Sequence, residues 1–184
     1  MAEDRESGIS LWLRRFLGTG AGIATAAGVV LGVWEYRQRG DLTRARETMD
    51  MITVWEQQGA RDAYRALSRD LETKIATELS EADVLAADQS RRAQRNLYAN
   101  ISRSVLATGD QKQNFEDVVY FFSRLSLCID AGLCDDRISK VFFGDTFHSF
   151  VLVFSTQISA REQVIAGFDD ALVNLERTFA RIEE

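Results

Sequence analysis

An uncharged run of nineteen residues near the amino terminus constrains this chain most. Phe16 to Trp34 contains no Asp, Glu, Lys or Arg, and arginines flank it on both sides. A helix of that length reaches roughly 28 Å, close to the hydrocarbon thickness of a bilayer. Trp12 and Trp34 lie where an aromatic belt would meet the membrane surface. The run predicts a transmembrane helix over residues 16–36, after a short amino-terminal segment over residues 1–15.

The same run has three other possible interpretations. A buried Gly/Ala-rich core helix of a soluble protein remains an alternative. A phosphate-cradling turn would need a preceding strand and a glycine where Ile23 stands. A cleaved signal peptide could end at Ala24-Thr25-Ala26, but Glu3 and Asp4 do not suit its basic start. We therefore expect an uncleaved anchor.

Small residues recur every four positions inside the run, at Gly20, Ala24, Gly28 and Gly32. This spacing places them on one stripe of a helix, where another helix backbone could approach closely. The stripe predicts packing against a transmembrane helix of a partner protein or of a second copy, which would make a homo-oligomer. Alternatively, the small residues only make a weakly hydrophobic anchor in the lipid bilayer.

Charge and cysteine usage suggest the side of the membrane. Four arginines follow the run within about twenty residues and three precede it, so the positive-inside rule favours a cytoplasmic carboxyl-terminal domain at the cell inner membrane. Cys128 and Cys134 have five residues between them, and we interpret them as reduced core thiols, which suits the same side.

The rest of the chain predicts helices. It has no proline, where the usual rate of about 5% would give roughly nine. We expect an amphipathic stalk over residues 37–59 and a helical bundle over residues 60–184. The stalk's apolar stripe is Leu42, Ala45, Met49, Ile52 and Trp55. The fold class is therefore all-α, with one amino-terminal transmembrane helix that continues into a cytoplasmic bundle.

Phenylalanine places the bundle's core in the second half of the chain. Ten of the eleven lie between Phe115 and Phe179, and each aromatic can bury about 150 to 250 Å². The run from Phe147 to Ser155 could be a strand, but the sequence has no second convincing strand to pair with it. We expect a buried helix there. Gly132 is expected to end the helix before it, and Asp135 to cap the short helix that follows.

Enzyme chemistry would have to use His148, because it is the one histidine of the chain. Asp145 lies three residues before it, and Cys128 or Ser149 could act as a nucleophile with this base. No nucleophile elbow or glycine-rich oxyanion turn accompanies them, and a di-metal bundle needs a second histidine. We expect a packed or half-buried histidine, with no catalytic residue, metal or cofactor.

The densest basic cluster is Arg91-Arg92-Ala93-Gln94-Arg95, in a chain whose formal net charge is -6. Such a cluster could touch anionic lipid or nucleic acid. We interpret it as a solvated helix face and expect no nucleic-acid partner, because Asp83 and Asp88 precede it.

Three segments resemble a family of bacterial membrane-anchored helical proteins that is classed as a domain of unknown function. They are VWEQQG at 54–59, NLYANIS at 96–102 and NFEDVVYFFSRLSLCIDAGLCDD at 114–136. The similarity covers about residues 40 to 160. It implies the architecture alone, because no catalytic residues come with the family.

The sequence leaves three function classes. The leading one is a non-enzymatic membrane-anchored interaction module, an accessory or scaffold subunit of a membrane protein complex. The second is a membrane-anchored effector or regulator in bacterial defence or stress response. The third is a hydrolase that uses His148.

Overall fold

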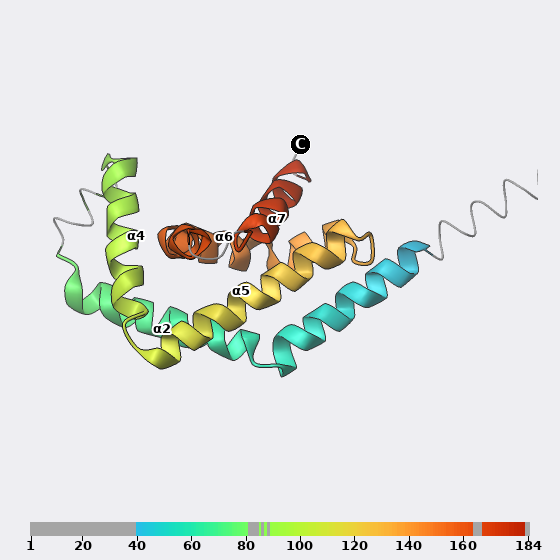
Figure 1. The fold of residues 1–184 in the computed structure, drawn as a ribbon, viewed down its shortest axis with the longest axis horizontal. Helices are drawn as coiled ribbons and strands as arrows, with labels where there is room; N and C mark the ends of the chain where they lie inside the picture. Colours follow the sequence, from blue (N-terminus) through green and yellow to red (C-terminus); the bar gives the residue numbers. More distant parts are fainter. Residues whose placement is uncertain (1–39, 81–84, 86, 88, 164–166, 183–184) are drawn as a thin grey trace, which may run out of the picture. The chain divides into compact units, whose positions relative to one another are not determined.

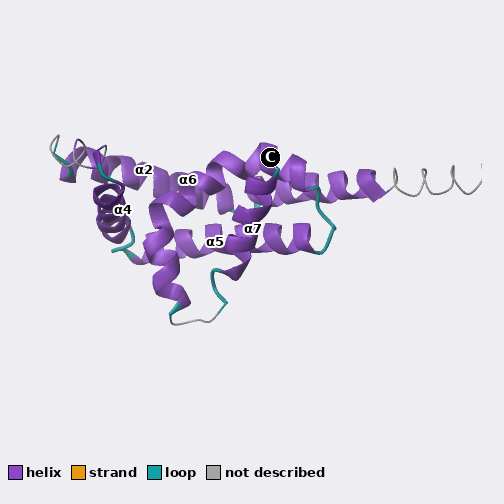
Figure 2. Ribbon diagram, turned by 90° about the horizontal axis from the view of Figure 1, so that it is seen from above, coloured by secondary structure: helices purple, strands orange, loops and turns teal. Residues whose placement is uncertain are grey.

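A computed structural model of the protein describes residues 40–80, 85, 87, 89–163 and 167–182. Within these ranges the chain forms helices and turns without a strand, which confirms the all-α expectation (Figure 2). None of the described helices is both long and apolar enough to cross a bilayer. The predicted span over residues 16–36, with its stripe Gly20, Ala24, Gly28 and Gly32, lies outside the described residues.

The chain divides into two units between Thr43 and Arg44, and the second unit contains the helical bundle. Residues 40–57 are helical, and a turn at Gly59, with a left-handed φ of 89°, ends this helix. Five further helices are described: α2 (Ala60–Glu78), α4 (Arg91–Val105), α5 (Gly109–Asp130), α6 (Asp136–Glu162) and α7 (Asp170–Arg181).

Side-chain caps set where three of these helices begin. Ser90 and Thr108 accept hydrogen bonds from backbone N–H groups in the first turns of α4 and α5. Asp135 Oδ1 accepts from the N–H of Ile138 at 2.9 Å, which confirms the predicted cap. The helix that it opens is α6, which has 27 residues and is not short. It contains the whole run from Phe147 to Ser155, so the helical interpretation of that run is confirmed.

The helices pack as a bundle in which neighbours in space are often distant in sequence (Figure 1). α2 packs along α5, and α5 packs against α7. α4 contacts both α2 and α6, so it joins two parts of the bundle. Glu78 Oε1, at the end of α2, accepts a hydrogen bond from Ser104 Oγ of α4 at 3.0 Å. α4 is therefore held at its carboxyl-terminal end.

An aromatic cluster fills the core between α5 and α6. The ring of Phe122 is fully buried, and its centroid lies 5.1 Å from Phe147 and 5.7 Å from Trp55. Trp55 also lies 4.7 Å from Phe121. These separations are typical of favourable aromatic pairs. The uneven spread of phenylalanine therefore predicted the position of the core correctly.

The predicted stripe before Gly59 was partly wrong. Leu42 and Met49 are exposed, whereas Thr48 is fully buried. Thr48 Oγ1 donates to the carbonyl of Arg44 at 2.9 Å and accepts from the backbone N–H of Asp135 at 2.8 Å. A polar group can be buried at this position because both of its hydrogen-bonding functions are satisfied. This bond joins the segment before Gly59 to the start of α6.

The two cysteines are not reduced thiols, which corrects the sequence interpretation. Cys128 and Cys134 form a disulfide with a Cα separation of 5.2 Å. Gly132 adopts a left-handed φ of 67° after α5, and the N–H groups of Leu133 and Cys134 both donate to the carbonyl of Cys128. This tight helix-ending turn folds the chain back and brings the second sulfur to the first.

Candidate functional site

Helix α4 has an unusual charge composition for this acidic protein. Its sequence, RRAQRNLYANISRSV, contains four arginines and no acidic residue. Three of them, Arg91, Arg92 and Arg95, lie in the first turns and are exposed. Among the described residues, no carboxylate forms an ion pair with any of the three. The start of α4 therefore presents a concentrated positive surface.

The position of these arginines opposes helix stability. The amino-terminal end of a helix carries a partial positive charge, so cations there are unfavourable by about 0.3–1 kcal/mol each. In contrast, α2, α5, α6 and α7 each have an acidic residue in the first turn. An arrangement that folding does not favour indicates a role in binding.

A groove of about 760 Å³ lies beside this surface, between α4 and α6. Its size falls in the usual range of ligand sites, about 300–1,000 Å³. From α4 come Arg91, Arg95 and Tyr98, and from α6 come His148 and a row of hydroxyl groups. That row is Ser155, Thr156 and Ser159.

One acidic side chain, Glu176 of α7, also lines the groove. Against it stand Arg91 and Arg95, so the formal charge of the lining is positive even with a neutral histidine. Arginine offers a rigid fork of donors that matches carboxylate and phosphate oxygens, and hydroxyl groups can donate to the same oxygens. The groove is therefore suited to an anionic group.

His148 is exposed on α6, where it lines this groove and a smaller one of about 460 Å³ between α6 and α7. Asp145 lines the smaller groove as well, which brings the two residues of the sequence pair to one surface. No hydrogen bond between them is formed in the described structure. The expectation of a packed or half-buried histidine was wrong, since the His148 side chain is exposed.

Neither candidate nucleophile forms a nucleophile–base pair with His148 in the described structure. Cys128 is bonded to Cys134 and so has no thiolate to offer. Ser149 is exposed and adjacent in sequence to His148, and consecutive residues of a helix do not face each other. Within the part of the chain that the structure describes, no group of three His, Cys, Asp or Glu side chains is placed to hold a metal ion.

Family comparison confirms the resemblance to a domain of unknown function. The sequence matches the family described as Domain of unknown function (DUF4760) over residues 22–178. The chain belongs to this family. Neither a curated protein nor a solved structure matches it. The match begins inside the uncharged run of residues 16–34, so this DUF4760 member shares with its family most of that run as well as the bundle.

Sequence reasoning about this DUF4760 chain missed the groove. The Arg91–Arg95 cluster was interpreted as a solvated face, and His148 was considered with Asp145, Cys128 and Ser149 but not with these arginines. The arginines and His148 line one groove because α4 packs on α6, which lies about fifty residues later in the chain. The periodicity of a sequence does not tell which helices pack together. One signal was available: arginines directly after the Ser90 cap stand where acidic residues are favoured.

Proposed function

We propose that the protein is a non-enzymatic, membrane-anchored interaction module whose α4–α6 groove binds an acidic segment of a partner protein. It would act as an accessory or scaffold subunit of a membrane complex. The observation that carries the proposal is the joint lining of one groove by Arg91, Arg95 and His148. The two arginines have no carboxylate partner in the described part of the protein, so carboxylates of a partner protein would supply one.

Anchoring by the run over residues 16–34 supports this role. Its length matches a bilayer, and the family match includes most of it. A fixed anchor raises the effective concentration of the bundle near a membrane-bound partner, so that a modest groove affinity suffices.

The stripe Gly20, Ala24, Gly28 and Gly32 would add a contact within the membrane. Gly28→Leu should weaken assembly, because a large side chain keeps helix backbones apart, while leucine preserves insertion. Val30→Leu changes a different face and should assemble normally. Native-gel mobility of the two variants in mild detergent compares them. Equal assembly would leave the stripe as an anchor only.

The side of the membrane is a separate part of the proposal. The arginine count that favours a cytoplasmic bundle differs by one residue, whereas the paired cysteines suit an oxidising compartment. We infer that the bundle faces the oxidising side. Intact cells would be treated with a membrane-permeant thiol blocker, and the recovered protein would then be denatured, reduced and labelled with a thiol reagent. Reduction should make two cysteines reactive that the blocker did not reach. Two blocked cysteines would restore the cytoplasmic orientation.

A binding assay tests the groove. Full-length protein in detergent micelles would be titrated into a fluorescent peptide of ten glutamates, and fluorescence anisotropy would report binding near physiological salt. Arg91→Gln with Arg95→Gln should weaken the affinity about tenfold or more, because two charge-assisted contacts are lost.

The matched control is Arg65→Gln with Arg177→Gln. Both arginines are exposed, neither lines the α4–α6 groove, and the net charge changes by the same amount. A general electrostatic attraction would weaken equally in both double variants, and that result would refute the groove as the binding site.

A further inference from the structure

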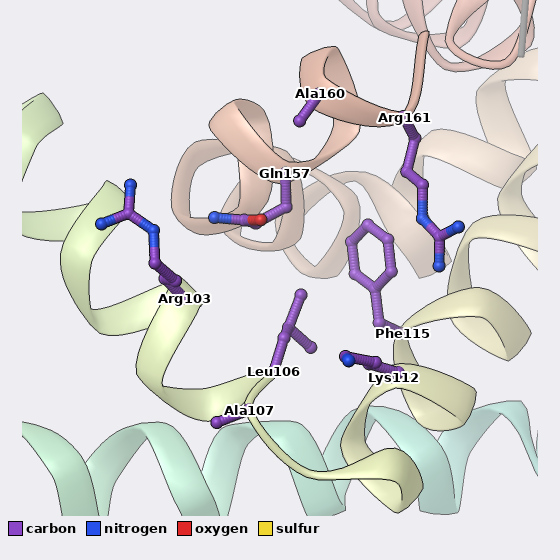
Figure 3. A pocket seen from close by; sticks show the side chains of 8 residues that line it. All are labelled: Arg103, Leu106, Ala107, Lys112, Phe115, Gln157, Ala160 and Arg161. Carbon is purple, nitrogen blue, oxygen red and sulfur yellow. The ribbon is translucent and has the colours of Figure 1, made fainter. Parts of the chain in front are cut away.

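A second basic hollow of about 580 Å³ lies where α4 ends, α5 begins and α6 passes above (Figure 3). Arg103 comes from α4, Lys112 from the first turns of α5, and Gln157 and Arg161 from α6. The floor is apolar, made by Leu106 and Phe115. It shares only Ala160 with the α4–α6 groove, so the two sites have different polar groups.

The three cations of this hollow are not equivalent. Arg161 forms an ion pair with Glu116, which neutralises its charge. In Figure 3 its guanidinium lies beside the Phe115 ring, across that ring from Arg103. Arg103 has a long contact to the neutral Asn100 at 3.5 Å. In the described part of the chain no carboxylate forms an ion pair with Arg103 or Lys112.

Two cations and one amide therefore surround the open part of the hollow. The Gln157 amide points toward the Arg103 side in Figure 3. Two positive charges without a counter-charge match a dianion better than a single carboxylate. A phosphate monoester carries a charge of about −1.5 to −2 at neutral pH, and its oxygens accept from guanidinium, ammonium and amide donors.

The apolar floor indicates that more than inorganic phosphate can bind. Ligand sites of this size combine an apolar lining with a few polar groups that fix the orientation. We propose that this hollow binds a phosphate monoester, with the phosphate between Arg103 and Lys112 and an apolar substituent over Leu106. The ester could be a soluble metabolite or a lipid headgroup of the phosphatidic acid type, and both share this chemistry.

Calorimetric titration of the full-length protein in neutral detergent micelles tests the proposal, with phenyl phosphate as the probe. The wild type should show saturable binding of one probe per chain. Arg103→Gln with Lys112→Gln should weaken binding about tenfold or more. Arg103→Lys with Lys112→Arg keeps both charges and should retain most of the affinity, which separates charge loss from misfolding.

One further variant and one lipid complete the design. The groove variant Arg91→Gln with Arg95→Gln should bind the probe as the wild type does, so this inference can fail or succeed independently of the proposed function. Phosphatidic acid added to the micelles should displace phenyl phosphate if the headgroup is a source, and failure to displace it assigns the site to soluble esters. Absence of saturable binding, or equal affinity in Arg103→Gln with Lys112→Gln, would overturn the proposal.

Discussion

The aromatic core and the surface of α4 affect the stability of the fold in opposite ways. In the core, Trp55, Phe121 and Phe122 form ring contacts at favourable separations. On α4, arginines occupy the end of the helix where the dipole disfavours them, and no described carboxylate compensates them. The side chains of the core stabilise the fold, whereas the arginines of α4 lower its stability. This difference is the physical basis for assigning binding to α4 and structure to the core.

The largest expected effect is in the core. Phe122→Ala removes a fully buried ring that contacts four aromatic neighbours and should lower the free energy of unfolding by about 3–5 kcal/mol. Chemical denaturation followed by circular dichroism measures this change. Phe142→Ala is the control, because Phe142 is 52% exposed. Similar losses in both variants would show that the aromatic cluster is not the source of stability.

The next effect concerns the bond between Thr48 and the start of α6. Thr48→Val leaves the backbone N–H of Asp135 without its acceptor and should cost about 1–3 kcal/mol of unfolding free energy. Thr53→Val is matched to it, because the hydroxyl of Thr53 is exposed and donates only to the carbonyl of Met49. If the two variants unfold at the same denaturant concentration, the link to Asp135 contributes nothing.

Removal of charge from α4 should have the opposite sign. Arg91→Gln with Arg95→Gln relieves unfavourable contacts with the helix dipole and should leave the stability unchanged or raise it by up to about 1 kcal/mol. The same denaturation measurement reports it. A loss of more than about 1 kcal/mol would mean that these arginines serve the fold, and the contrast between the two regions would disappear.

A buried hydroxyl gives the smallest effect and sharpens the comparison within the core. Ser126 Oγ is buried and has no hydrogen-bond partner among the described residues, whereas Ser139 Oγ donates to the carbonyl of Asp135 at 2.7 Å. Ser126→Ala should therefore be neutral or slightly stabilising, within about 0.5 kcal/mol, and Ser139→Ala should cost about 1 kcal/mol. Thermal unfolding of the two variants orders them, and the reverse order would disprove this explanation of the core.

Acid should loosen the turn between α6 and α7. Backbone N–H groups of Gly167 and Asp169 donate to Glu162 and hold the pKa of its carboxyl below the ordinary value. This stabilisation is present above the unfolded pKa and is lost as the pH falls through the folded pKa. Burial and the charge of Glu162 raise the pKa of Asp169. Uptake of a proton by Asp169 therefore favours the folded state as the pH falls, which opposes the effect of Glu162. Amide hydrogen exchange of Gly167, measured between neutral and acid pH, reports the sum of the two effects. Glu162→Gln should reduce the pH dependence of this protection.

Much of the bundle was predictable because local patterns determine it. Leu172, Leu175 and Phe179 have the spacing of one helix face, and all three are buried. Phe115, Val118, Phe122 and Leu125 of α5 have the same kind of spacing and are buried, whereas Phe121 is buried outside that spacing. Such stripes depend only on the period of a helix and on the removal of apolar side chains from water.

The features that escaped prediction depend on contacts between distant segments. The buried Thr48 is explained by the N–H of Asp135, 87 residues later, and the α4–α6 groove by the pairing of two helices. The disulfide is a local exception, because Gly132 and the cysteine spacing together signal the turn that forms it. A search for helix-ending turns near cysteines would have found it.

The most direct test of the central claim is a reversal of charge. If Arg91 and Arg95 recognise an acidic segment, Arg91→Glu with Arg95→Glu should bind a ten-lysine peptide and lose the ten-glutamate peptide. Anisotropy titration of both peptides against the full-length wild type and variant measures the exchange of preference. The predicted result is a switch of at least about tenfold in the ratio of affinities, with the stability of the bundle maintained. An unchanged preference for the glutamate peptide would contradict the claim that the start of α4 is built for binding.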